Sequence, residues 1–161
     1  MTRIAIIDDW QGIAEASIDW QPLRAKAALT FFQAPFPTAD ALVAALADFD
    51  AVMVMRERSA FPAAVIGRLP KLRIISSPGG RNAAIDLAAC TAQGVLVCNT
   101  PATGSGNSTA ELALGLLLAC ARHIAQGDAE IRAGGFQQRV PPGLDLAGRM
   151  LGIRGLGRIG A

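Results

Sequence analysis

Short apolar runs constrain the fold of this chain more than any other feature of its sequence. Each has four or five residues, and alanine-rich stretches separate them. The runs lie at 4–7, 51–55, 72–76, 95–98 and 150–153, with a weaker candidate at 29–33. Continuous apolar runs of this length are typical of strands buried on both faces, as in a parallel sheet. Their alternation with helical stretches predicts an α/β fold with right-handed crossovers.

The alanine-rich stretches have the pattern of helices. We expect helices at 22–29, 38–49, 61–69 and 83–94. Thr38 is a good N-terminal cap for the second, and Gly94 can end the fourth in a left-handed conformation. Strands and helices up to residue 98 are therefore predicted to form one layered domain.

A second segment begins with "NTPATGSGNST" at 99–109, whose Pro, Gly, Ser and Thr content predicts a loop or hinge. A long helix is expected at 109–126. It is apolar nearly all round from Leu112 to Ala121, so it should be buried in a core or at a subunit interface. A short helix closing at Gly134, a proline-rich turn and the terminal strand should follow.

Composition excludes several classes of function. Of the 161 residues, 52% are apolar and 17% are charged, which predicts a globular chain. The formal charge is +2, and the basic residues are too scattered to form a patch that could bind nucleic acid. Cys90, Cys98 and Cys120 have no metal or redox spacing, which fits reduced thiols in the cytoplasm. The N-terminus lacks a signal-peptide pattern, and the longest apolar stretch is about half of a membrane span, so no membrane partner is expected.

One candidate site is the G-x-G-x-x-G motif formed by Gly155, Gly157 and Gly160 after the last apolar run. Such glycines permit a tight turn and close approach to a pyrophosphate, which sits at the N-terminus of the next helix. The sequence stops at Ala161, before that helix and before the acidic residue expected about 20 positions later. The motif alone is equally compatible with a glycine-rich turn that binds nothing.

A second candidate site lies where the fourth predicted strand ends. Gly80, Arg81 and Asn82 offer backbone N–H groups, a guanidinium and an amide, which are the parts of an anion or carboxylate site. Arg56 follows the third strand and should lie at the same edge of the sheet, where parallel α/β sheets bind ligands. An ordinary turn with an exposed arginine, and a solvated charge cluster at 56–59, are the alternatives.

Four stretches together resemble the D-2-hydroxyacid dehydrogenase family. They are "AVMVMRERSAFP" (51–62), the block at 69–101, "TAELALGLLLACAR" (109–122) and "LDLAGRMLGIRGLGRIG" (144–160). The resemblance implies a flavodoxin-like parallel-sheet substrate domain over 1–98, lacking its C-terminal return segment. It implies the truncated start of a Rossmann domain over 99–161. The implied reaction is hydride transfer between the nicotinamide of NAD or NADP and a 2-hydroxy or 2-keto acid.

The resemblance also assigns roles to particular residues. Cofactor contacts are implied for Gly155, Gly157, Arg158, Ile159 and Gly160, and more weakly for Thr109. Gly80 and Arg81 occupy the place of the loop that binds the substrate carboxylate through backbone N–H groups, and Asn82 and Arg56 are further candidates for substrate binding. The usual family pattern there is glycine followed by an Asp-Asn pair, so Gly80-Arg81-Asn82 leaves the identity of the 2-hydroxy acid open.

The family's catalytic arginine, histidine and acidic partner lie beyond the glycine motif. No residue of this chain, His123 included, therefore inherits a catalytic role, and we expect no metal site, weak NAD binding and no activity from it alone. In the full-length enzyme, the helix at 109–126 would form the interface of a homodimer. In this chain alone, the exposed helix should promote association with other copies of the chain, and residues from about 127 onward should be loosely packed. Arg154 stands where the family has a small aliphatic residue, so it needs an exit or a partner unless the strand is unburied. A stand-alone carboxylate-binding module and a structural subunit pairing through that helix are the alternatives.

Overall fold

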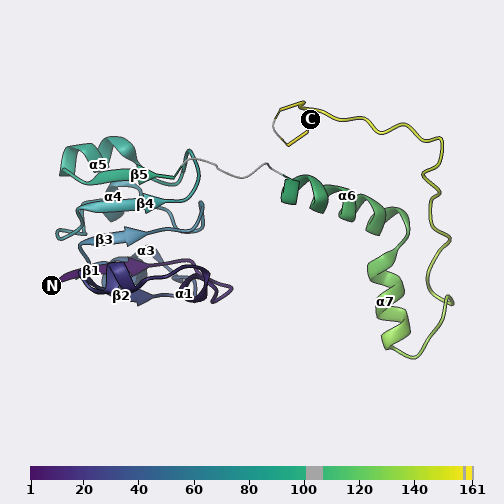
Figure 1. Ribbon diagram of the computed structural model, residues 1–161, viewed down its shortest axis with the longest axis horizontal. Helices are drawn as coiled ribbons and strands as arrows, with labels where there is room; N and C mark the ends of the chain where they lie inside the picture. Colours follow the sequence, from purple (N-terminus) through teal and green to yellow (C-terminus); the bar gives the residue numbers. More distant parts are fainter. Residues whose placement is uncertain (101–106, 158, 161) are drawn as a thin grey trace. The chain divides into compact units, whose positions relative to one another are not determined.

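The computed structural model describes residues 1–100, 107–157, 159 and 160 (Figure 1). The chain divides into two units, Met1–Ala102 and Thr103–Ala161. All regular strands among the described residues belong to the first unit, and the second contains two helices.

The first unit is built on a parallel sheet of five strands in the order β2-β1-β3-β4-β5. The strands are β1 (Thr2–Ile6), β2 (Ala27–Phe31), β3 (Ala51–Met53), β4 (Ile74–Ser77) and β5 (Leu96–Asn99). This is the flavodoxin-like order, in which the direction of winding reverses between β1 and β3. The predicted α/β fold with a parallel sheet is confirmed.

Five short helices connect the strands. They are α1 (Ala14–Ser17), α2 (Gln21–Arg24), α3 (Ala39–Leu46), α4 (Ala63–Ile66) and α5 (Leu87–Gln93). As predicted, Thr38 caps α3, its hydroxyl accepting from the N–H of Ala41 at 3.1 Å, and Gly94 ends α5 with a φ of 73°. The helix predicted at 22–29 is confirmed only over 22–24, within α2, because pairing with β1 draws residues 27–31 into β2 and overrides the helical preference of alanine. The weaker strand candidate at 29–33 overlaps β2.

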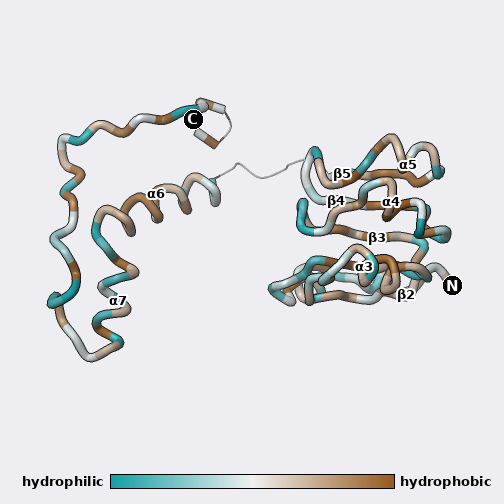
Figure 2. Tube along the Cα trace, turned by 180° about the vertical axis from the view of Figure 1, so that it is seen from behind, coloured by the Kyte–Doolittle hydropathy of each residue, from teal (hydrophilic) through white to brown (hydrophobic). Residues whose placement is uncertain are grey.

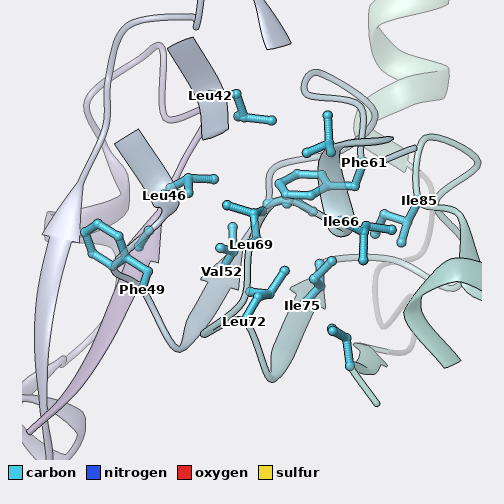
Figure 3. Close-up of a cluster of buried hydrophobic side chains, with 14 of the residues drawn as sticks. Leu42, Leu46, Phe49, Val52, Phe61, Ile66, Leu69, Leu72, Ile75 and Ile85 are labelled. Atoms are coloured by element: carbon cyan, nitrogen blue, oxygen red, sulfur yellow. The ribbon is translucent and has the colours of Figure 1, made fainter. Parts of the chain in front are cut away.

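The hydrophobic core lies between one face of the sheet and helices α3, α4 and α5 (Figure 3). Phe61 and Ile66 are fully buried there, against Leu46, Val52 and Ile75. Every member of this core falls between residues 5 and 95. Apolar burial of this kind is the main favourable term in folding, so the first unit carries its own source of stability.

The opposite face of the sheet is only partly covered. Ile74 on β4 and Leu96 on β5 point to it and are 39% and 58% exposed, whereas Ile75 is fully buried. The expectation that all strands are buried on both faces is therefore wrong for β4 and β5. Within the described part of the chain, no element packs over these two side chains.

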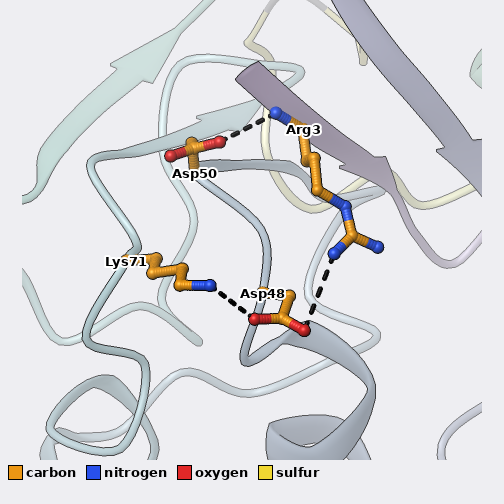
Figure 4. A network of polar contacts seen from close by, with 4 residues as sticks. All are labelled: Arg3, Asp48, Asp50 and Lys71. Atoms are coloured by element: carbon orange, nitrogen blue, oxygen red, sulfur yellow. Dashed lines mark hydrogen bonds and ion pairs between the residues drawn. The ribbon is translucent and has the colours of Figure 1, made fainter. Parts of the chain in front are cut away.

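A polar network joins the amino ends of the strands, away from the loops that follow them (Figure 4). The backbone N–H of Arg3 donates to Asp50 at 2.8 Å, and Lys71 Nζ donates to Asp48 at 2.6 Å. The guanidinium of Arg3 lies 3.6 Å from the same Asp48 carboxylate. The hydrogen bond from Lys71 holds the pKa of Asp48 below its ordinary value.

The second unit begins with α6 (Asn107–Ala121), followed by α7 (Ile124–Arg132). The helix predicted at 109–126 is confirmed over 109–121, within α6, but it does not continue unbroken to 126, because His123 adopts a left-handed conformation with a φ of 52°. No residue of α6 is buried, although it is strongly apolar (Figure 2). Its leucines at 112, 114, 116 and 118 are 50 to 61% exposed, so the predicted burial of this helix does not occur within the described residues.

Residues 150–153 form no strand, and the predicted terminal strand is wrong in this chain. Met150, Leu151 and Ile153 are exposed, since a parallel strand needs a neighbour and the described part of this unit holds none. Arg154 is exposed as well, so its guanidinium needs no buried partner. No single described helix is long and apolar enough to cross a membrane; α6 and α7 reach that length and composition only as a pair bent by 63°.

Candidate functional site

The carboxyl ends of the central strands carry the loops that the sequence singled out (Figure 1). Arg56 follows β3, the 78–82 loop follows β4, and Asn99 and Thr100 end β5 and continue from it. Since all the strands are parallel, these segments share one edge of the sheet. Ligands of open α/β sheets bind at this edge.

Asn82 ties the 78–82 loop to two strands. Its side chain is only 8% exposed, and its Nδ2 donates to the carbonyl of Arg56 at 2.7 Å and to Ser77 Oγ at 3.2 Å. Its Oδ1 accepts from the N–H of Ala84 at 2.9 Å. The loop and Arg56 are thus brought together as expected, but through the backbone of Arg56. The Asn82 amide itself is engaged within the protein, which is the arrangement of a side chain that holds a loop in place.

Gly79 is held by the end of β5. Its N–H donates to Thr100 Oγ1 at 3.2 Å, and its carbonyl accepts from Asn99 Nδ2 at 3.3 Å. Its φ of 89° lies in the region that glycine adopts without steric cost. The roles of Asn99 and Thr100 are not evident from the sequence, because both residues belong to the predicted hinge.

Gly80 and Arg81 lie between these two anchored points. Both are exposed, and within the described part of the chain neither their backbone N–H groups nor the Arg81 guanidinium has a hydrogen-bond or ion-pair partner. They line a pocket of about 260 Å³ together with Asn82 and Asn99. Ile85 and Val97 form part of its apolar wall. Free N–H donors and a cation at the rim of such a pocket can bind a carboxylate and a short carbon chain.

Arg56 is exposed and has a φ of 62°, which is unusual for a residue other than glycine. Among the described residues its guanidinium has no ion-pair partner, so its charge is available at the same edge of the sheet as Arg81. The bond from Asn82 to its carbonyl fixes this conformation.

The link between β1 and the β3 loop was missed by the sequence analysis. Arg58 Nη1 donates to the carbonyl of Asp8 at 2.6 Å, and Ser59 Oγ donates to Asp8 Oδ1 at 2.7 Å. The Arg58 guanidinium also lies 4.5 Å from the centre of the Trp10 ring. Asp8 is fully buried with a φ of 65°, and its Oδ2 has no partner among the described residues. The pair of aspartates directly after the first apolar run was the available signal.

The proposed cofactor residues lie in the second unit. Gly155 has a φ of 96°, and the Gly160 N–H donates to the carbonyl of Gly157 at 3.0 Å. A Cβ at Gly160 would lie 2.1 Å from the Gly155 carbonyl oxygen, so the turn folds back on its own first glycine.

Of the other residues in this set, Ile159 is exposed and Thr109 is an exposed residue of α6, whereas Arg158 lies outside the described residues. A largely apolar pocket of about 740 Å³ lies between α6 and residues 151–155, 159 and 160. The described residues contain no group of three or more His, Cys, Asp or Glu side chains that could hold a metal ion.

Fold and site together define a class of protein: an α/β domain with a five-stranded parallel sheet, whose carboxyl edge presents a loop held by hydrogen bonds at both ends. Comparison with known proteins gives the family. The family model described as "D-isomer specific 2-hydroxyacid dehydrogenase, catalytic domain" matches residues 5–150, and the chain belongs to this family.

Individual relatives agree with this assignment. The D-3-phosphoglycerate dehydrogenase of Mycobacterium leprae is 41% identical over 124 residues, which cover 77% of this chain and 23% of that protein. A phosphoglycerate oxidoreductase from Vibrio cholerae O395 is 33% identical with a TM-score of 0.90, covering 99% of this chain and 50% of that one. D-lactate dehydrogenase from Escherichia coli, at 21% identity and a TM-score of 0.72, shares the fold. The chain thus spans about a quarter of the curated relatives and half of these solved chains.

Proposed function

We propose that this chain carries the carboxylate-binding part of an NAD-dependent D-2-hydroxyacid dehydrogenase. The carboxylate of a 2-hydroxy or 2-keto acid would bind at Gly80 and Arg81. The observation that supports this most directly is the set of unpaired N–H groups and guanidinium at the 260 Å³ pocket, between two points of the loop that are fixed by hydrogen bonds. Charge-assisted hydrogen bonds to a carboxylate are roughly twice as strong as neutral ones, so these donors suit an anionic ligand.

Arg56 would add a second positive charge at this edge of the sheet. Asn82 would act by holding Arg56 and the loop together, because its amide already bonds within the protein. This assignment departs from the expectation that Asn82 contacts the substrate itself.

NAD, when bound, would supply the hydride acceptor for oxidation of the hydroxyl-bearing carbon. The glycine turn in this chain fits that cofactor poorly by itself, since the Gly160 N–H bonds to Gly157 and the turn closes on Gly155. His123 is the chain's only histidine and lies at the start of α7, so we assign it no proton-transfer role. We therefore expect these 161 residues alone to bind NAD weakly and to oxidise no 2-hydroxy acid.

The experiment is a calorimetric titration of the 161-residue chain with glyoxylate, D-lactate and 3-phosphoglycerate. We expect binding of at least one acid without NAD, weakened about 10-fold or more by Arg81→Ala, because hydrogen bonds to charged groups contribute about 1.5–3 kcal/mol. Arg73→Ala makes the same change in charge beside the amino end of β4 and should leave the affinity unchanged. Absence of binding by all three acids, or equal effects of the two variants, would contradict the proposal.

A stand-alone carboxylate-binding module is the second candidate. It is favoured by the core, which lies wholly within residues 5–95 and does not depend on the second unit. Sequencing the coding DNA beyond codon 161 separates the two: a Rossmann continuation with an arginine and a histidine supports the dehydrogenase, and an immediate stop codon supports the module.

A further inference from the structure

Asn99 and Thr100, where the chain leaves the sheet, both form hydrogen bonds to Gly79, which precedes the proposed carboxylate-binding residues Gly80 and Arg81. We infer that these two residues are positioning residues of the carboxylate site, which set the direction of the Gly80 N–H. The inference rests on the proposed function, because it names the groups that prepare that site for its ligand.

Asn99 acts on the Gly80 N–H through the geometry of a single peptide bond. The carbonyl of Gly79 and the N–H of Gly80 belong to the same peptide group, which is planar and trans, so the two point in opposite directions. Asn99 Nδ2 donates to that carbonyl at 3.3 Å. Fixing the carbonyl therefore fixes the N–H that we propose as a carboxylate donor, although Asn99 does not touch the N–H itself.

Thr100 fixes the peptide on the other side of Gly79. Its hydroxyl oxygen accepts from the Gly79 N–H at 3.2 Å, and its own N–H donates to the carbonyl of Ser77 at 3.2 Å, next to the paired residues Ser77 and Asn99. Thr100 is thereby held against the end of β4 while it holds Gly79. Both peptide groups of Gly79 are bonded to the last residues of the sheet.

These bonds matter because Gly79 has no side chain that could fix its backbone. Even an added Cβ at this position would meet no atom within 4 Å. Glycine is also the residue with most conformational freedom to lose. At the other end of the loop, the buried Asn82 provides the second fixed point. The Gly80–Arg81 segment is thus ordered in advance, and ordering before binding reduces the entropic cost of the complex.

The test compares variants of the 161-residue chain that differ by one hydrogen-bonding group. Thr100→Val removes the acceptor of the Gly79 N–H, and Asn99→Ala removes the donor to the Gly79 carbonyl. Two variants serve as controls. Thr100→Ser keeps the hydroxyl, and Thr91→Val makes the same threonine change on α5, where the hydroxyl bonds to the carbonyl of Leu87. The first readout is the backbone order parameter of Gly80 by NMR relaxation, without ligand. We expect about 0.85 in the wild type, Thr100→Ser and Thr91→Val, and below about 0.6 in the two variants that lose a bond.

The second readout is affinity for glyoxylate, D-lactate and 3-phosphoglycerate. Loss of one typical hydrogen bond corresponds to about fivefold weaker binding, and we expect this loss of affinity for Thr100→Val and Asn99→Ala. The thermal midpoints of both variants should stay close to that of the wild type, because both bonds are exposed. An unchanged Gly80 order parameter in both variants overturns the inference whatever the ligands do. A lowered order parameter with no binding of any acid by the wild type supports the restraint and overturns the proposed function, so the two failures are distinguishable.

Discussion

Replacing Asn82 with alanine is the sharpest test of how the candidate site is held together. The substitution removes three hydrogen bonds, at 2.7 Å to Arg56, 3.2 Å to Ser77 and 2.9 Å to Ala84. At about 1 kcal/mol net for each bond, the free energy of unfolding should fall by about 3 kcal/mol, or nearer 2 kcal/mol where water reaches the vacated rim of the loop. In urea denaturation this corresponds to a midpoint lower by about 1–2 M.

Two controls make the result specific. Arg81→Ala, in the same loop but exposed and unpaired, should change stability by no more than about 0.5 kcal/mol while weakening carboxylate binding. Asn82→Asp keeps an acceptor for the Ala84 N–H but places a carboxylate oxygen against the Arg56 carbonyl, so it should destabilise at least as much as alanine. If Asn82→Ala without ligand unfolds within about 0.5 kcal/mol of the wild type, Asn82 does not hold the loop and the reasoning is wrong.

Three further predictions concern the rest of the first unit. The Lys71 hydrogen bond lowers the pKa of Asp48 in the folded chain. The stability that Asp48 contributes is therefore present above its unfolded pKa and is lost as the pH falls through the lower, folded value. In urea denaturation at several pH values, the stability difference between the wild type and Asp48→Asn should shrink below about pH 4. Ile66→Ala should cost about 2–5 kcal/mol and Ile66→Val about 0.5–1.5 kcal/mol, and equal costs would contradict its place in a packed core. Gly94→Ala should cost about 1–2 kcal/mol by thermal denaturation, because alanine is strained at a φ of 73°, and an unchanged midpoint would refute that explanation.

Sequence patterns predicted the sheet well because buried strands leave a local signature. The apolar runs at 51–55 and 95–98 coincide with β3 and β5 to within two residues, and the caps at Thr38 and Gly94 were found from single residue types. Such features depend on side chains that lie near one another in sequence. The pairing order of the strands does not, and here it came only from the family resemblance.

The errors have a common physical cause, which is that tertiary neighbours decide the state of ambiguous segments. Residues 27 and 28, predicted as helical, became part of a strand because β1 offered them a partner, and 150–153 did not become a strand because the described part of their unit offers none. The left-handed His123 divides a helix that periodicity presents as continuous.

In the candidate site too, features set by neighbouring residues could be predicted from the sequence, and long-range hydrogen bonds could not. Gly80 and Arg81 could be singled out because a glycine-rich turn with an arginine after a strand is a local pattern. The bond between Arg58 and Asp8 spans 50 residues, and that between Asn82 and Arg56 spans 26, so neither leaves a trace that can be read from adjacent residues. The sequence accordingly offered Asn82 as a substrate-binding residue without revealing its bonds within the protein.

The strand order has a consequence for how the chain folds during synthesis. Once β2 has paired with β1, each later strand adds to the open edge of the sheet already formed: β3 to β1, β4 to β3 and β5 to β4. Domains fold from the N-terminus as they leave the ribosome, so this sheet can grow in the order of translation without rearrangement. Because Asn99 and Thr100 come last, a nascent chain halted before them would lack the two side chains that bond to Gly79, although Asn82, already made, could hold the other end of the loop.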